Sequence, residues 1–204
     1  MRARSSPVTL LDSGPLREYG VLQKPLSFGL VRRLQAYLNA AINETPLQRF
    51  LEKNPLVLGQ HLAGGHGGWV IPGSRLGSQL VPDFVIGEHH GGRCRWTIVE
   101  LESPSVRLFT RDGDATRPLQ HGIGRIRGWR AWLHDHGSYA RAQLSLADIS
   151  GNAHALILIG RRARLRPEDA RRRRQLEAEE KVAIHTYDWL LDGANETHTE
   201  PGGR

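Results

Sequence analysis

Two apolar stretches that carry acidic residues decide how this chain folds: Val81-Pro82-Asp83-Phe84-Val85-Ile86 and, after a turn, Trp96-Thr97-Ile98-Val99-Glu100-Leu101-Glu102-Ser103-Pro104. Both are rich in β-branched and aromatic residues, which is typical of strands. Because successive side chains of a strand point to opposite sides, Glu100 and Glu102 should project from the same face. The sequence therefore predicts two adjoining strands with carboxylates gathered on one side.

The electrostatics of this face favour a bound cation. At about 3.3 Å of rise per residue, Glu100 and Glu102 lie about 6 to 7 Å apart. Two ionised groups at that distance repel by about 2 to 3 kcal/mol at an effective dielectric of about 20, against well under about 1 kcal/mol in bulk water. Trp96 and Ile98 share the face, which argues against open solvent around the carboxylates. The alternative is a solvated strand face, where the repulsion is slight.

Outward from these strands, apolar spacing predicts the other elements. A helix from Pro25 should turn Phe28, Val31, Leu34, Leu38 and Ile42 inward, and a short helix should span 44–54. Pro118 opens a helix whose inward residues are Leu119, Ile123, Ile126, Trp129 and Leu133. Strands are predicted at 69–71, 81–87 and 95–102, as an antiparallel meander, and at 155–159 and 182–187; helices are predicted at 167–181 and 188–191. This order predicts an α/β fold, a mixed central β-sheet flanked by helices.

Length and composition predict one domain with appendages. With 204 residues, the chain suits a single core over 25–192, preceded by a flexible arm at 1–24 and followed by a disordered tail at 193–204. No apolar run is long enough to cross a bilayer, and the start lacks the apolar segment of a signal peptide. Cys94 is the single cysteine, so no internal disulfide can form. We expect a cytoplasmic protein without a membrane partner.

The positive charge comes almost wholly from arginine. A formal net charge of +7 and a pI near 10.3 raise encounter rates with polyanions such as nucleic acid. Arg161 and Arg162, together with the run at 171–174, can follow a phosphate backbone. The acidic residues at 177–180 offer an alternative, in which the arginines of that run form intrahelical ion pairs on a solvated face.

The acidic strands resemble a known superfamily. An Asp that ends one strand segment and Glu-x-(acid or Lys) on the next is the pattern of PD-(D/E)xK nucleases, written here as Pro82-Asp83 and Glu100-Leu101-Glu102. With the preceding Leu47-Gln48-Arg49-Phe50-Leu51-Glu52-Lys53-Asn54-Pro55 and the later Ile159-Gly160-Arg161-Arg162, the chain from about 44 to 191 resembles the C-terminal nuclease domain of Shedu-type anti-phage defence proteins. The resemblance implies a restriction-endonuclease-like core.

The same resemblance implies chemistry and partners. Asp83 and Glu100, with the carbonyl of Leu101, would hold Mg²⁺ or Mn²⁺, and Glu44 is a candidate for the extra acid on the preceding helix. Hard divalent cations prefer such oxygen ligands and activate water for phosphodiester hydrolysis. The expected catalytic residues are Asp83, Glu100, Glu102 and Arg125, and the expected DNA contacts are Arg127, Arg161 and Arg162. Shedu-type proteins tend to oligomerise, so we expect a homo-oligomer, and the trigger for activity is expected in a regulatory partner protein.

One departure from the pattern leaves alternatives open. Glu102 stands where the superfamily usually has lysine, and a glutamate cannot supply that positive charge. Glu102 is then a further metal ligand, or Arg125 or Arg127 replaces the lysine, or the site binds without cutting. The last case predicts an inactive nuclease fold that serves as a nucleic-acid-binding or regulatory subunit, while a module for protein interactions would not bind nucleic acid at all. Asp83 and Glu44 also have ordinary alternatives, as a cap of backbone amides and as a helix-start acid.

Overall fold

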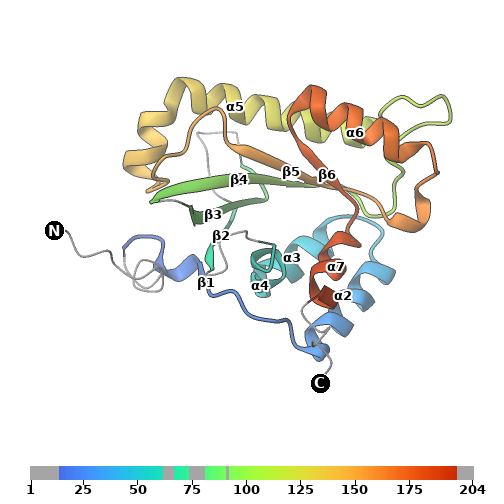
Figure 1. Cartoon of the computed structure of the whole chain (residues 1–204), viewed down its shortest axis with the longest axis horizontal. Helices are drawn as coiled ribbons and strands as arrows, with labels where there is room; N and C mark the ends of the chain where they lie inside the picture. Colours follow the sequence, from blue (N-terminus) through green and yellow to red (C-terminus); the bar gives the residue numbers. More distant parts are fainter. Residues whose placement is uncertain (1–13, 62–66, 74–80, 91, 197–204) are drawn as a thin grey trace, which may run out of the picture.

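The computed structural model describes residues 14–61, 67–73, 81–90 and 92–196, and its centre is one six-stranded sheet (Figure 1). The strands are β1 (Gly20–Val21), β2 (Gly68–Pro72), β3 (Phe84–His90), β4 (Arg93–Leu101), β5 (His154–Leu158) and β6 (Ala183–His185). They lie side by side in chain order, from β1 to β6. Neighbours are antiparallel from β1 to β4, whereas β4, β5 and β6 run parallel. The sheet is mixed, and the predicted meander of β2, β3 and β4 is confirmed.

Helices cover both faces of the sheet. They are α2 (Phe28–Ala40), α3 (Thr45–Lys53), α4 (Leu56–Gly59), α5 (Arg117–Gln143), α6 (Asp169–Glu180) and α7 (Trp189–Glu196), with short 3-10 turns η1 (Arg17–Tyr19) and η2 (Arg162–Arg164). Figure 1 shows α5 and α6 over one face and α2, α3, α4 and α7 over the other. Both parallel connections carry a helix, α5 before β5 and α6 before β6, as parallel pairing requires. Among the described residues, no helix is both long and apolar enough to cross a membrane.

Two apolar cores follow from the alternation along β4. Trp96 and Ile98 belong to the core beneath α5, whereas Val99 and Leu101 belong to the core that α2, α3 and α7 cover. The α5 core contains all the residues predicted to face inward from that helix: Leu119, Ile123, Ile126, Trp129 and Leu133. Glu100 and Glu102 have the same parity as Trp96, so the carboxylates lie on the α5 side of the sheet. The alternation predicted for the strand at 95–102 and the inward face predicted for the helix from Pro118 are both confirmed.

The predicted inward face of α2 is only partly right. Leu30, Leu34 and Leu38 are buried, and the Ser27 side chain caps the helix by accepting a hydrogen bond from the Leu30 N–H. Phe28, however, is 70% exposed and Ile42 is 77% exposed. The helix ends at Ala40, so Ile42 lies outside it, and Phe28 is about 200° around the helix from Leu30 at 3.6 residues per turn.

The ends of the described chain are more ordered than the sequence predicts. Within the predicted arm, Gly20 and Val21 pair with Trp69 and Gly68 as strand β1. At the other end, α7 continues to Glu196, past the predicted helix end at 191 and into the predicted tail. The remainder of both predictions, 1–13 and 197–204, lies outside the described residues.

Candidate active site

The predicted acids meet at the carboxyl end of β4. Phe84 pairs with Val99 in the β3–β4 ladder, so Asp83, one residue before β3, lies beside Glu100. The Asp83 Oδ2 accepts a hydrogen bond of 2.7 Å from the Leu101 N–H. Asp83 is therefore both a cap of the strand end, the ordinary alternative, and a neighbour of Glu100.

Glu100 has the most perturbed carboxyl group of this cluster. Its Oε1 lies 2.7 Å from the Arg125 Nε of α5, while its Oε2 is buried without a hydrogen-bond partner among the described residues. Burial, and next the charge of Asp83, raise the pKa of Glu100 to about 9. Burial also raises the pKa of Asp83. Carboxylates that are this hard to ionise gain strongly from a nearby cation.

Glu102 is fixed by hydrogen bonds at the same edge. Its N–H donates to the Leu158 carbonyl and its own carbonyl accepts from the Tyr187 hydroxyl, both at 2.9 Å. Its Oε1 lies 2.8 Å from the His121 Nδ1. Burial raises the pKa of Glu102, and the hydrogen bond from His121 opposes that rise. The side chain is thus positioned as a pair with an imidazole of α5.

At Gly122, α5 packs closely on these carboxylates. A Cβ at this position would lie 3.4 Å from both Glu102 Cγ and Ile157 Cδ1. The helix backbone therefore packs directly on the end of the sheet, which brings His121 and Arg125 over the acids. The glycine costs some intrinsic helix stability, as the sequence indicates.

The cluster offers ligands for a divalent ion. One donor atom each from Glu100, Glu102 and His121 all lie within 4.8 Å of one another, the only such group of three found in the described part of the chain. Carboxylate oxygens suit Mg²⁺ and Mn²⁺, and the imidazole nitrogen suits a transition metal such as Mn²⁺ better than Mg²⁺. The orphaned Oε2 of Glu100 is an acceptor that an ion would satisfy.

Glu44 stands near the cluster without belonging to the group of three. It precedes α3, and its charge adds to the raised pKa values of Asp83, Glu102 and Tyr187. The charge of Glu52, which the sequence suggests is a surface residue, also raises the pKa of Asp83. The α3 helix therefore contributes negative potential to the site.

The four candidate arginines have different surroundings. Arg125 lies in the site, where its Nη2 donates to the Val81 carbonyl at 2.6 Å and its guanidinium covers the Trp129 ring. Arg127 is paired with Glu180 of α6. The other two face the C-terminal segment instead of the acids: Arg161 pairs with Asp188 and donates to the Leu38 carbonyl, and Arg162 pairs with Asp192.

His121 is the site residue that sequence reasoning did not assign. The available signal was its spacing, because His121 and Arg125 are four residues apart and share a face of the predicted helix. What the sequence does not show is that this face lies over Glu102. The histidine becomes significant only once α5 is placed on β4.

These features define the class: an α/β domain with a mixed sheet and an acidic cluster at the carboxyl end of a central strand. The chain belongs to the family described as Shedu protein SduA, C-terminal, whose model matches residues 41–191. Among solved structures, the restriction endonuclease FokI bound to DNA is similar, with a TM-score of 0.46 and 12% sequence identity, over 82% of this chain and 27% of that chain. This chain thus spans about a quarter of the length of FokI. No curated protein sequence matches it.

Proposed function

We propose that this protein is a metal-dependent nuclease that hydrolyses phosphodiester bonds in DNA and acts in defence against phage. The observation that carries the proposal is the convergence of Asp83, Glu100 and Glu102 at one strand end, where a buried oxygen of Glu100 has no hydrogen-bond partner among the described residues. Membership in the Shedu C-terminal family supports both parts of the proposal, because the sequence resemblance is to the nuclease domain of anti-phage defence proteins.

Mg²⁺ or Mn²⁺ is the proposed cofactor. Asp83 and Glu100 would hold the ion, as the resemblance implies. Glu100 also belongs to the group of three with Glu102 and His121, whereas Asp83 lies outside that group and adjoins Glu100 through the strand pairing. When bound, such an ion polarises a phosphodiester and lowers the pKa of an attacking water. The chain itself supplies a base in Glu102, because a carboxyl group whose pKa is raised by burial holds an abstracted proton better. His121 positions that carboxylate.

Arg125 is the proposed substitute for the missing lysine. It is the cation nearest the acids, and as a planar donor it can bind phosphate oxygens in two places. In this structure its Nε lies 2.7 Å from the Glu100 Oε1. A divalent ion held by Asp83 and Glu100 would supply positive charge to these acids, and the Arg125 guanidinium would then be available to the phosphate and would stabilise its developing negative charge.

A second candidate function rests on the same ion pair. Arg125 occupies Glu100 Oε1, and Glu102 stands at the lysine position, so the arrangement also fits a nuclease fold that has lost activity and binds nucleic acid as a regulatory subunit. That protein would bind DNA with an affinity that falls as the salt concentration rises. It would not cut DNA, whichever metal ion is added.

Incubation of the purified protein with plasmid and phage DNA, in Mg²⁺, Mn²⁺ or EDTA, separates the two candidates. If the protein is a nuclease, it cuts DNA in Mg²⁺ or Mn²⁺ but not in EDTA. Asp83→Ala and Glu100→Gln should then abolish cutting. Glu179→Gln, on the exposed face of α6, is the matched control and should cut as wild type does. Equal cutting by wild type and Asp83→Ala would remove the acids from catalysis, and binding without cutting would establish the silent subunit.

We further propose that the protein assembles as a homo-oligomer and is triggered by a partner, as the family resemblance implies. Light scattering coupled to size exclusion measures the assembly directly. A monomer across concentrations would contradict the first part of this proposal.

A further inference from the structure

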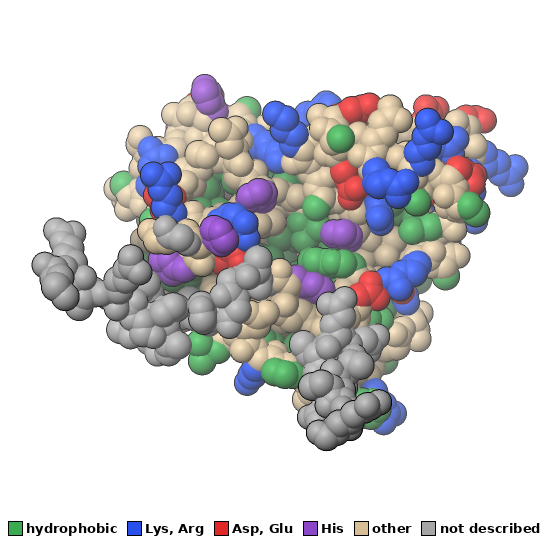
Figure 2. Space-filling model, viewed as in Figure 1, with side chains coloured by type: hydrophobic (Ala, Val, Ile, Leu, Met, Phe, Trp, Pro, Cys, Tyr) green, Lys and Arg blue, Asp and Glu red, His purple; other side chains and the backbone are tan. Residues whose placement is uncertain are grey.

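A second hollow lies on the opposite face of the sheet from the acids. It has a volume of about 350 Å³ and is floored by Ile86, Thr97 and Leu156. Thr97 points away from the Glu100 side of β4, and it stands at the middle of the strand, three residues before Glu100. Figure 2 shows this hollow as an apolar floor with histidine and basic side chains around it. It is therefore separate from the proposed nuclease site.

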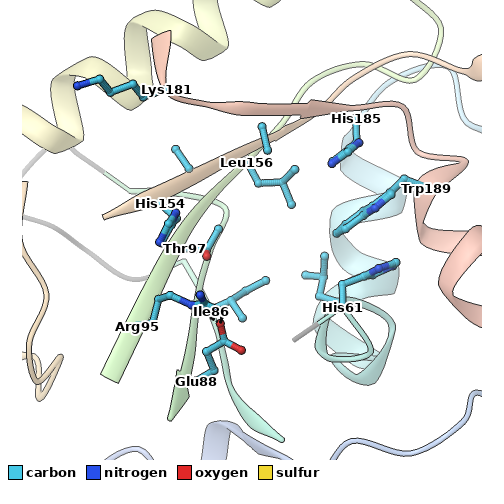
Figure 3. Close-up of a pocket in the computed structure, with 13 residues that line it drawn as sticks. His61, Ile86, Glu88, Arg95, Thr97, His154, Leu156, Lys181, His185 and Trp189 are labelled. Atoms are coloured by element: carbon cyan, nitrogen blue, oxygen red, sulfur yellow. Dashed lines mark hydrogen bonds and ion pairs between the residues drawn. The ribbon is translucent and has the colours of Figure 1, made fainter. Parts of the chain in front are cut away.

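One wall of the hollow is aromatic. His61, at the end of α4, stacks on Trp189 of α7 with ring centroids 3.5 Å apart, and His185 of β6 stacks on the other side of Trp189 at 4.7 Å. Figure 3 shows the three rings lying parallel along one side of the cavity. A flat apolar floor beside an aromatic wall suits a planar heterocycle, which gains from burial and from ring contacts.

The polar group in the hollow is an incompletely paired carboxylate. Glu88 and Arg95 are direct partners in the β3–β4 ladder, and the Arg95 Nε donates to the Glu88 Oε1 at 2.6 Å. The Glu88 side chain is only 9% exposed, and its Oε2 is buried with no hydrogen-bond partner in the described residues. Figure 3 shows this carboxylate inside the cavity. A buried acceptor of this kind calls for N–H donors.

A neutral imidazole and two basic side chains complete the lining. The Nε2 of His61 is also buried and unpartnered in the described chain, and burial lowers the pKa of His61 to about 4, so the ring is neutral at pH 7. At the rim, Lys181 and His154 are exposed, and no ion pair of the Lys181 ammonium is found in the described residues. The rim therefore suits an anionic group such as phosphate.

We propose that this hollow binds a guanine nucleotide. The N1–H and 2-amino groups of guanine are adjacent donors that a carboxylate accepts together, which matches the free side of Glu88. The ring system lies on the floor beside the aromatic wall, and the phosphate extends to Lys181. Adenine, cytosine and uracil lack this pair of adjacent donor groups, so they satisfy the carboxylate less fully and bind less well.

Calorimetric titration with GMP, in EDTA, tests the proposal, with AMP, CMP and UMP for comparison. GMP should bind most tightly, and Glu88→Gln should weaken GMP binding by about tenfold or more. Glu179→Gln is the matched control, because it makes the same change at an exposed helix position that does not line the hollow. Ala183→Trp, at an exposed position lining the hollow, should block binding without disturbing the core.

The same chemistry can come from a free nucleotide or from a guanine in single-stranded nucleic acid. A short oligonucleotide with one unpaired guanine, compared with an all-thymine one, distinguishes them: tighter binding than GMP that still depends on Glu88 assigns the hollow to nucleic acid. Asp83→Ala should bind GMP normally, so this test is independent of cleavage. If neither GMP nor the oligonucleotide binds, or if both Glu88→Gln and Ala183→Trp bind as wild type does, the proposal is wrong.

Discussion

At the scale of single residues, Glu100 sets the electrostatics of the acidic cluster. It is 4% exposed, pairs with Arg125 through one oxygen and leaves the other unpartnered among the described residues. A group whose pKa is about 9 when folded, against about 4.5 as its ordinary value, holds its proton in the folded protein over the pH range where it is ionised in the unfolded chain. The folded state thus loses stability relative to the unfolded state as pH rises through this range.

Glu100→Gln should therefore stabilise the metal-free protein more and more as pH rises. Below the ordinary pKa both forms are neutral and the difference is small; above it, each pH unit adds up to about 1.4 kcal/mol to the advantage of the variant until the folded pKa is reached. Thermal melts in EDTA from about pH 5 to pH 9 measure this difference. A constant difference in melting temperature across the range would show that Glu100 titrates normally.

The His121–Glu102 pair gives a second prediction at this scale. Because the hydrogen bond from His121 lowers the pKa of Glu102, His121→Ala should raise that pKa and move the onset of DNA cleavage to higher pH. His134→Ala, on the exposed face of the same helix, is the control and should leave the profile unchanged. Calorimetry with Mn²⁺ decides the alternative: a large loss of Mn²⁺ affinity with an unshifted profile would make His121 a metal ligand.

At the scale of elements, glycines show where helices and strands touch. Gly124 of α5 has open space at its Cβ position, whereas a Cβ on Gly87 of β3 would lie 2.4 Å from the Trp96 ring. Trp96 cannot easily yield, because it is buried in the α5 core. The two glycines therefore have opposite roles, one dispensable and one required by the packing of β3 on β4.

Alanine substitutions should separate these roles. Gly124→Ala removes a helix-interior glycine and should add about 1 kcal/mol to the free energy of unfolding, or about 2 to 4 °C in melting temperature. Gly87→Ala should lower it by about 1 to 3 kcal/mol through overpacking. Urea titration of both variants measures the changes. Equal effects would mean that the Trp96 ring moves aside without cost.

The elements themselves could largely be predicted from the sequence, because their periods are set locally. The alternation in 96–102 and the helical spacing in 119–133 are both realised in β4 and α5. The short α4 and the two-residue β1 were missed, since such elements carry too little pattern and depend on the contacts around them. For the site, the acids follow from the strands, but the placing of His121 and Arg125 over them depends on how closely α5 packs at Gly122.

At the scale of the whole molecule, ion pairs of arginine hold distant segments together. Arg161 is 18% exposed in its side chain and links the carboxylate of Asp188 to the Leu38 carbonyl at the end of α2. Arg127 and Arg162 are more exposed and pair with Glu180 and Asp192. These contacts have a structural role whether or not the same residues touch DNA.

Substitution distinguishes the two roles. Arg161→Ala should lower the free energy of unfolding by about 3 kcal/mol, because it leaves the largely buried Asp188 carboxylate without its charged partner. Arg127→Ala and Arg162→Ala should cost less than about 1 kcal/mol, as exposed pairs do. If Arg127 and Arg162 contact phosphate, as the sequence predicts, each of these two substitutions should reduce the slope of log DNA affinity against log salt concentration by about 0.9. An unchanged slope would leave them as structural residues alone.

The order of the strands has a consequence for how the protein behaves in a crowded cell. Each strand pairs with the one made just before it, so during synthesis the sheet can extend from one side without being opened to insert a later strand. The two edge strands of the sheet are the two-residue β1 and the three-residue β6. Edge strands this short present few unpaired backbone N–H and C=O groups, so a second molecule cannot easily pair with them and aggregate.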